Sequence, residues 1–250
     1  MLEMATHTGA AHLYEQFGLD GRTIAITGAG RGIGRAIAIE AARAGARVAA
    51  CSRTELDLAA LRREIEYLGG QCDSYVVDVS DTDALSTFTE AVADQSGALD
   101  GFVNNAGWNL LKAAVDYTRA EVDRILDLNL RAYYWGCVSA RTMKVLGRGG
   151  SIVNVTSRAG LVGNPGRAPY SAAKAGVNNL TRTLAGELAT DGIRVNAVAP
   201  GLTATGLATE FLDGHPDEAH RMVERIPLGR FAECDEIARP VVFLLAQRRP

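Results

Sequence analysis

Tyr170 and Lys174 stand four residues apart in the stretch YSAAK, a spacing that places both side chains on one face of a helix. A tyrosine hydroxyl delivers a proton near neutral pH only if its pKa of about 10 is lowered, and a neighbouring ammonium group lowers it. Ser157 precedes this pair and offers a hydroxyl to a developing negative charge. An isolated pair with this spacing is more commonly a packed tyrosine beside a solvated lysine. The pair therefore needs support from the rest of the sequence.

A second chemical signal is the glycine-rich stretch TGAGRGIG at residues 27–34, which lies between an apolar run and a helical pattern. Glycine serves tight strand-to-helix turns because it readily adopts positive φ angles. The N–H groups at the start of the following helix also suit a phosphate. The usual dinucleotide pattern G-x-G-x-x-G fails here, since Ile33 occupies its last glycine position. The stretch alone fits a structural turn and a phosphate cradle equally.

Short apolar runs alternate with longer helical patterns along the chain. We predict strands at 23–28, 47–52, 74–79, 99–107, 151–157 and 193–201, and helices at 32–45, 54–68, 82–96, 118–146 and 168–189. This βαβ rhythm is typical of a parallel sheet with helices on both faces. We therefore predict a single doubly wound α/β domain over residues 1–250, with residues 1–20 as an N-terminal extension.

The composition is that of an ordinary globular protein, with 250 residues, 47% apolar and 22% charged residues and a net charge of −3. Without a basic stripe, the sequence favours small-molecule partners over nucleic acid or a membrane surface. Neither a targeting segment nor an apolar stretch of about 18 residues occurs, so we expect a cytoplasmic location. The cysteines and histidines lack ligand spacing, which predicts reduced, buried thiols and no metal site.

Several motifs together identify a resemblance. NNAG at residues 104–107 ends the fourth predicted strand, Ser157 ends the fifth, and PGLTAT follows the sixth. With TGAGRGIG and YSAAK, these motifs closely resemble the short-chain dehydrogenase/reductase family over about residues 20 to 247. The resemblance implies a Rossmann domain that exchanges a hydride with a nicotinamide cofactor. It also implies a catalytic set of Asn129, Ser157, Tyr170 and Lys174.

The same resemblance implies a role for each catalytic side chain. Hydride transfer to a carbonyl leaves an alkoxide, and Tyr170 is expected to give it a proton while Lys174 lowers the pKa of Tyr170. Ser157 is expected to hydrogen-bond the carbonyl oxygen as charge develops there. Asn129 is expected to hold a water that links Lys174 to solvent.

The expected cofactor is NADP(H), with NAD less favoured. The second strand ends AACSRT, without the carboxylate that NAD-preferring sites use for the ribose 2′-hydroxyl. Arg53 and Arg31 are placed to converge on a 2′-phosphate, and two exposed surface arginines are the alternative. By resemblance, Asp78 meets the adenine and Thr203 the nicotinamide amide. The expected cofactor contacts are Thr27, Gly28, Gly30, Arg31, Gly32, Ile33, Gly34, Ser52, Arg53, Asp78, Val79, Asn105, Ala106, Gly107, Tyr170, Lys174, Pro200, Gly201 and Thr203.

The sequence contains fewer indications about the substrate than about the cofactor. Residues 202–231 are predicted to form a lid whose apolar side chains either line a pocket or pack on the body of the protein. We favour reduction of a ketone or 3-oxoacyl thioester, with a polyol or sugar-acid dehydrogenase as the alternative. A non-catalytic dinucleotide-binding sensor or scaffold is a third possibility, although such proteins typically lack one of the catalytic side chains. The expected substrate contacts are Trp108, Ser157, Gly163, Asn164, Tyr170, Leu207 and Phe211.

The end of the sequence carries an expectation about assembly. The stretches IPLGRF and EIARPVVFLLA resemble a family region that continues into a final strand, whereas this sequence ends at QRRP. Either the chain is truncated or it dispenses with that strand, so we expect six parallel strands rather than seven. Family members commonly pair through the helices expected near 118–146 and 168–189. We therefore expect a homo-oligomer, with the dimer kept and a tetramer weaker or absent.

Overall fold

The computed structural model describes residues 17–206, 214 and 216–246 of the chain. Within this part, six parallel strands form one sheet in the order β3-β2-β1-β4-β5-β6. The strand order reverses beside β1, which confirms the doubly wound α/β fold and the predicted six strands. The strands are β1 (Thr23–Thr27), β2 (Arg47–Ser52), β3 (Gln71–Val76), β4 (Gly101–Asn104), β5 (Gly150–Val155) and β6 (Ile193–Val198).

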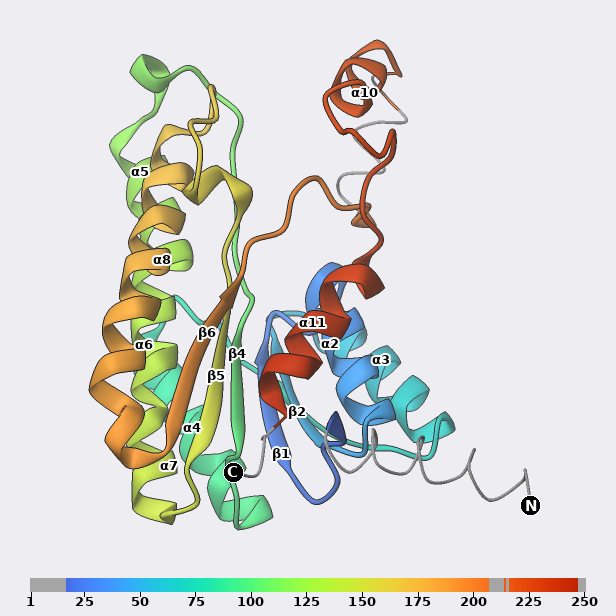
Figure 1. Cartoon of the computed structure of the whole chain (residues 1–250), viewed down its shortest axis with the longest axis vertical. Helices are drawn as coiled ribbons and strands as arrows, with labels where there is room; N and C mark the ends of the chain where they lie inside the picture. Colours follow the sequence, from blue (N-terminus) through green and yellow to red (C-terminus); the bar gives the residue numbers. More distant parts are fainter. Residues whose placement is uncertain (1–16, 207–213, 215, 247–250) are drawn as a thin grey trace, which may run out of the picture.

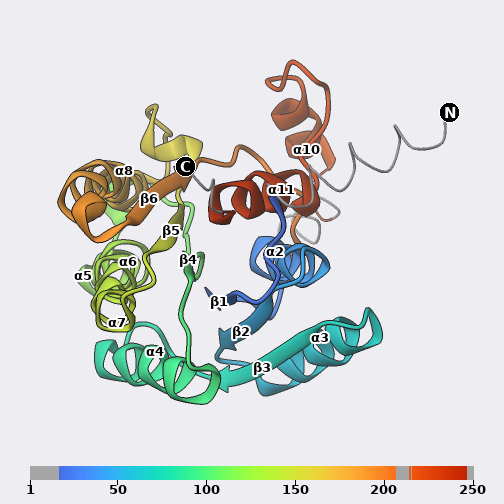
Figure 2. The same ribbon diagram turned by 60° about the horizontal axis from the view of Figure 1, so that its bottom comes forward.

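Helices cover both faces of the sheet, as Figures 1 and 2 show. One face carries α2 (Gly32–Arg43), α3 (Glu55–Tyr67) and α11 (Cys234–Leu245). The other carries α4 (Thr82–Ser96), α5 (Arg119–Leu126), α6 (Ala132–Val138), α7 (Ala140–Leu146) and α8 (Ala168–Leu188). Shorter elements are η1 (Ala114–Asp116), η2 (Asp127–Arg131), η3 (Arg158–Gly160), η4 (Ala189–Asp191) and α10 (Pro216–Val223). The helix α10 stands away from these layers in Figure 1.

The two faces of the sheet each carry a hydrophobic core. All residues of β1 and β5 are buried, as expected of central strands covered on both sides. On the α2 face, Ile37 and Ala41 share a core with Val241 and Leu245 of α11, and all four are almost fully buried. The last helix that the structure describes therefore packs directly on α2.

The third strand begins and ends earlier than predicted, at Gln71–Val76 instead of 74–79. Its burial alternates because it lies at the edge of the sheet. The apolar residues Val77 and Val79, which suggested a longer strand, follow its end. Val79 is buried and Val77 packs against the same core. These two valines are therefore apolar because they pack against the core after the strand has ended, and not because they pair with a neighbouring strand.

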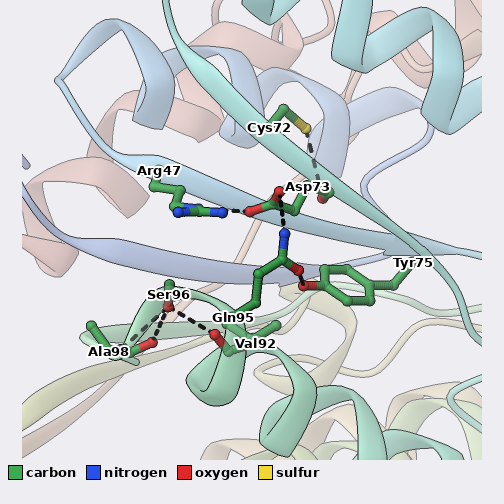
Figure 3. Close-up of polar contacts among 8 residues, drawn as sticks. All are labelled: Arg47, Cys72, Asp73, Tyr75, Val92, Gln95, Ser96 and Ala98. Carbon is green, nitrogen blue, oxygen red and sulfur yellow. Dashed lines mark hydrogen bonds and ion pairs between the residues drawn. The ribbon is translucent and has the colours of Figure 1, made fainter.

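A polar network fastens this edge strand to its neighbours (Figure 3). Asp73 of β3 accepts a charged contact from Arg47 Nε of β2 at 2.7 Å. Asp73 also accepts a hydrogen bond from Gln95 Nε2 of α4 at 2.9 Å. The Tyr75 hydroxyl donates to Gln95 Oε1 at 2.5 Å. These contacts tie β2, β3 and α4 together far from the catalytic residues.

The long helix predicted at 118–146 is interrupted. A capping box of Thr118 and Glu121 starts α5, which is followed by η2, a π-helical turn, before α6 begins. A second break at Ser139 separates α6 from α7. π-helical turns hold one more residue per turn than an α-helix and occur frequently at functional sites. Apolar periodicity does not reveal such a turn, because the flanking helices keep the expected pattern.

Two structural observations concern classes of site. Of the helices in the described part of the chain, none is both long and apolar enough to cross a membrane. Among those same residues, no group of three or more histidine, cysteine, aspartate or glutamate side chains is placed to hold a metal ion.

Thiol reactivity should separate the cysteines sharply. Burial raises the pKa of the thiols of Cys51, Cys72 and Cys137 to about 12, and it also raises the pKa of the half-buried Cys234. Because the thiolate is the reactive form, we expect a disulfide reagent at about pH 8 to modify Cys234 first. Mass spectrometry of the labelled native protein checks this, with the unfolded protein as the control. Rapid labelling of Cys51 in the folded protein would contradict the burial described here.

Candidate active site

The glycine turn between β1 and α2 is held by the loop that follows β4. Thr27 Oγ1 accepts hydrogen bonds from the backbone N–H groups of Asn105 and Ala106 at 2.9 and 3.1 Å. In return, the Asn105 side-chain amide donates to the carbonyls of Thr27 and Gly28 at 3.0 and 3.2 Å. The TGAGRGIG and NNAG motifs, distant in the sequence, thus form one interlocked structure.

Two glycines of this turn are required by close approach. Gly28 has φ +64, and a Cβ there would lie 2.8 Å from Ala106 Cα. A Cβ on Gly34 would collide with the carbonyl oxygen of Gly28. Arg31, at the N-cap of α2, makes no side-chain capping bond, and the first turn holds no acidic residue. The N–H groups at this helix end therefore suit an anion, which favours the phosphate cradle over a purely structural turn.

A cavity of about 480 Å³ lies over this turn, beside the carboxyl ends of the central strands. In doubly wound sheets, ligands bind at this position. It is lined by many expected cofactor contacts: Gly28, Gly30, Arg31, Gly32, Ile33, Gly34, Ser52, Arg53, Asp78, Val79, Asn105, Ala106 and Gly107. Its other lining residues, which the sequence did not single out, are Thr54, Asp57, Val77, Leu128, Thr205 and Gly206. Thr27 is buried, and the other expected contacts, Tyr170, Lys174, Pro200, Gly201 and Thr203, do not line the cavity.

The cavity brings together charges of both signs. Arg53 Nη1 lies 4.0 Å from Asp78 Oδ2, and both side chains are about half exposed. Partial burial raises the pKa of Asp78, but hydrogen bonds from Ser80 and the charge of Arg53 outweigh burial and lower it. Asp57, from the first turn of α3, also lines this cavity. Its Cβ lies 2.8 Å from the point that a Cβ on Gly30 would occupy. The sequence correctly showed no carboxylate at the end of β2, but Asp57 of α3 brings a carboxylate to the same cavity.

Thr203 is placed differently from the expectation. It is buried, it forms an isolated parallel bridge with Ala232, and its hydroxyl donates to the Gly201 carbonyl at 3.3 Å. Thr205 lines the cavity instead, and its methyl carbon lies 3.3 Å from the Cβ position of Gly32. The stretch PGLTAT contains both threonines, and the backbone turn between them decides which one faces the cavity.

The structure brings Tyr170 and Lys174 to one face of α8, as their spacing predicts. Lys174 is 3% exposed, and burial lowers its pKa to about 7. Its Nζ donates to the Val155 carbonyl at 3.0 Å and to the Tyr133 hydroxyl at 2.8 Å. The same nitrogen lies 5.8 Å from the centroid of the Tyr170 ring. The ammonium group therefore sits between the end of β5 and the catalytic tyrosine expected from the motif.

The pKa of Tyr170 differs from the expectation. Burial raises it, although a hydrogen bond with Ser157 and the charge of Arg167 act in the opposite direction. Lys174 does not supply the expected lowering in this structure, because burial favours its neutral form and two of its N–H groups serve Tyr133 and Val155. Ser157 Oγ accepts a bond from Ala159 N at 3.1 Å, which leaves its own proton for donation.

Asn129 lies at the centre of the π-helical turn η2 and is fully buried. Its side-chain amide donates to the carbonyls of Trp108 and Ile125 at 2.6 and 2.9 Å. Its Oδ1 has no hydrogen-bond partner and lies 2.7 Å from the Cβ position of Gly107. A buried carbonyl oxygen without a donor suits an ordered water. The π-turn thus points an acceptor toward the loop that lines the cofactor cavity.

Comparison with known proteins decides the family. Residues 22–215 match the short chain dehydrogenase family. The chain belongs to this family. It is 40% identical to a 3-oxoacyl-[acyl-carrier-protein] reductase from Thermotoga maritima over 90% of this chain and 91% of the relative. It is 38% identical to a D-erythrulose reductase from Gallus gallus, over 91% and 89% of the two chains.

Solved structures agree with this assignment of the short-chain dehydrogenase. One is described as a putative NAD(P) dependent gluconate 5-dehydrogenase from Beutenbergia cavernae with bound NADP. It superposes with a TM-score of 0.87 at 37% identity and covers 92% of each chain. The family identifies this chain as an oxidoreductase that uses a nicotinamide cofactor.

The substrate side of this short-chain dehydrogenase is partly described. The Arg124 guanidinium lies 4.3 Å from the centroid of the Trp108 ring, which holds the indole by a cation–π contact. The Tyr117 hydroxyl lies 2.6 Å from the Leu110 carbonyl oxygen and 3.0 Å from the Gly166 carbonyl oxygen, so these two acceptors share its one proton. These bonds join the loop after NNAG to the loop before Tyr170.

The remaining expected substrate contacts have mixed outcomes. Gly163 is exposed and Asn164 is half-buried in the loop that precedes α8. Leu207 and Phe211 lie outside the described residues, so their place in a lid stays a prediction. Asn109, two residues after the NNAG motif, has a buried Oδ1 without a hydrogen-bond partner. The described part of this region therefore offers both apolar and hydrogen-bonding surface.

Proposed function

We propose that this short-chain dehydrogenase is an NADP(H)-dependent reductase of a ketone or 3-oxoacyl thioester, with Tyr170 as its proton donor. The observation that carries the proposal is the buried Lys174 side chain, whose Nζ lies 5.8 Å from the centroid of the Tyr170 ring, together with Ser157, which acts to lower the pKa of that tyrosine. When bound, the reduced nicotinamide supplies a hydride to the carbonyl carbon. The glycine turn, the uncapped end of α2 and the surrounding cavity fit such a cofactor.

Each catalytic side chain has a defined task in the proposed reaction. Ser157 donates a hydrogen bond to the carbonyl oxygen as negative charge develops there. Tyr170 gives its proton to that oxygen, so the carbonyl becomes a secondary alcohol and the tyrosine becomes a tyrosinate. Lys174 in its charged form stabilises the tyrosinate of Tyr170. A water on Asn129 Oδ1 would return a proton toward Lys174.

A polyol or sugar-acid dehydrogenase is the second candidate. The unpartnered Oδ1 of Asn109 favours it, because a buried acceptor near the site suits a substrate hydroxyl. The relatives named for erythrulose and gluconate support the same class. A non-catalytic sensor is disfavoured, since all four catalytic positions are filled.

One assay separates these candidates. Oxidation of NADPH is followed spectroscopically with a panel of simple ketones, 3-oxoacyl thioesters, ketoses and keto acids. The proposal expects the highest kcat/KM with ketones or acyl thioesters. A clear preference for ketoses or sugar-derived keto acids would establish the second candidate instead. Tight NADPH binding without turnover of any substrate would favour the sensor.

We also propose that the chain pairs through the outer face of α6, α7 and α8. This face holds a shallow groove of about 310 Å³, lined by Tyr134, Cys137, Val138, Ala140, Arg141, Lys144, Leu184 and Leu188. Tyr134, which lines the groove, stacks edge to face with its neighbour Trp135, and both rings are substantially exposed. An isologous dimer across this face would bury these rings.

The dimer is tested by a charge placed in the groove. Tyr134→Arg should convert a dimer at micromolar concentration into a monomer, because the dimer would bury an unpaired charge in a groove that already holds Arg141 and Lys144. Tyr67→Arg is the matched control, since Tyr67 is an exposed tyrosine on α3 at the opposite face. Light scattering over a concentration series measures both variants. A monomeric unmodified protein, or a Tyr134→Arg variant that stays dimeric, would rule out this interface.

A further inference from the structure

Tyr133 occupies a position that the proposed reaction does not yet use. It lies on α6, one helical turn after Asn129, and is 1% exposed. Its hydroxyl donates to the Val155 carbonyl at 2.8 Å and accepts a hydrogen bond from Lys174 Nζ at 2.8 Å. Lys174 Nζ also donates to the Val155 carbonyl at 3.0 Å. The three groups form a closed triangle of hydrogen bonds inside the protein.

The chemistry of the three groups fixes the direction of every bond in this triangle. A carbonyl oxygen only accepts and an ammonium group only donates. The Tyr133 proton must therefore go to Val155, which leaves a hydroxyl lone pair for Lys174. No alternative arrangement of protons keeps all three bonds while Lys174 is charged.

The triangle also accounts for most of the donors on Lys174. An ammonium group has three N–H donors, and Tyr133 and Val155 take two of them. In the described part of the chain, no carboxylate lies within ion-pair distance of Lys174. Its charged form therefore depends on neutral acceptors, with the Tyr133 ring 4.0 Å from Nζ adding a cation–π contact.

We propose that Tyr133 is a positioning residue of this active site, whose hydroxyl holds the Lys174 ammonium beside Tyr170 with one N–H left for the reaction. This inference rests on the catalytic role proposed above for Lys174. Packing alone does not require the hydroxyl, because phenylalanine would fill the same buried space. A buried hydroxyl that is fully bonded on both sides specifies one arrangement of its partners.

Loss of the hydroxyl should affect the reaction through Lys174. In Tyr133→Phe the ammonium keeps only one of its two acceptors, so its charged form is less stable and its side chain is less fixed. The tyrosinate of Tyr170 then has weaker support. We expect kcat to fall about 5- to 10-fold, with little change in the KM for NADPH. The tyrosine-dependent limb of the kcat profile for alcohol oxidation should move up by about half to one pH unit.

The titratable and charged groups around Lys174 determine which residues a movement of the pH profile of kcat can report on. They are Tyr133 and Cys137 from α6, Tyr170 from α8 and, beyond it, Arg167. Burial raises the pKa of Cys137 to about 12, and arginine keeps its charge throughout the measured range. A movement of the profile therefore reports on Lys174 and the two tyrosines. Tyr75→Phe is the matched control, because it removes a hydrogen-bonded hydroxyl far from the site.

A double-mutant cycle tests the contact independently of turnover. Tyr133→Phe and Lys174→Met are made singly and together, and thermal unfolding is measured for each. We expect Tyr133→Phe to lower Tm by about 2 to 4 °C more in the unmodified chain than in the Lys174→Met background. An additive cycle together with an unshifted pH profile in Tyr133→Phe would overturn the proposal. If Lys174→Met kept full turnover, the proposed function of Lys174 would fail, and Tyr133 would lose its role even with a non-additive cycle.

Discussion

Replacing Tyr170 by phenylalanine should lower kcat for carbonyl reduction by about 10²- to 10⁴-fold, while NADPH binding stays within a few fold. The ring would keep its place on α8 beside Lys174, and Tyr170 is not among the residues that line the cofactor cavity. Only the proton donor would be lost. Steady-state rates give kcat, and titration of NADPH fluorescence gives Kd for the same preparation.

Two further variants make this result specific to Tyr170. Tyr117→Phe removes a hydroxyl that bonds backbone carbonyls of the neighbouring loops, and it should cost far less activity. Lys174→Ala should harm both turnover and NADPH binding, because the resemblance places this lysine near the cofactor ribose as well. Substantial turnover by Tyr170→Phe would remove Tyr170 from the mechanism.

The unmodified enzyme should prefer NADPH over NADH by about tenfold or more in kcat/KM, and Arg53→Ala should remove most of that preference. Arg53 and Arg31 both line the cavity beside the end of β2, where a 2′-phosphate would meet them. A charged contact of this kind weakens with salt, so added salt should reduce NADPH binding more than NADH binding. Initial rates with both cofactors over a salt series provide the measurement.

The presence of Asp57 in the same cavity sharpens this test. Its carboxylate would repel a 2′-phosphate, so Asp57→Asn should leave the NADPH preference unchanged or increase it a few fold. Arg62→Ala is the control for Arg53, since Arg62 is an exposed arginine of α3 that pairs with Glu66 at 3.5 Å. Equal use of both cofactors by the unmodified enzyme, or an Arg62→Ala variant that matches Arg53→Ala, would refute the arginine argument.

The fold followed from the sequence because its signals are local. The glycine turn, the central strands and most helices are set by short-range apolar patterns and by residues that favour positive φ. The third strand was misplaced because Val77 and Val79 pack beyond its end. The π-helical turn around Asn129 was missed because a change in hydrogen-bond register leaves the residue pattern intact.

The sequence singled out candidate site residues that stand in single motifs, and it did not single out residues that reach the site from distant segments. Ser157, Tyr170 and Lys174 stand in recognisable motifs, whereas Asp57 enters the cavity from a helix that carries no motif. The contact between Tyr133 and Lys174 joins α6 to α8 and has no sequence signature. Such contacts depend on how helices cross, which the residue pattern of either helix does not encode.

Because α11 packs on α2, the chain holds all its proposed catalytic residues before it holds all the residues that complete its hydrophobic core. Every proposed catalytic residue has been synthesised by Lys174, about sixty residues before α11 begins at Cys234. Figure 1 shows α11 lying beside α2. A chain that ended before α11 would hold the entire reactive set and still expose Ile37 and Ala41, the α2 residues that share a core with α11. Exposed core surface of this kind attracts chaperones and proteases. Cellular quality control would therefore act on prematurely terminated products that already carry the whole proposed catalytic set.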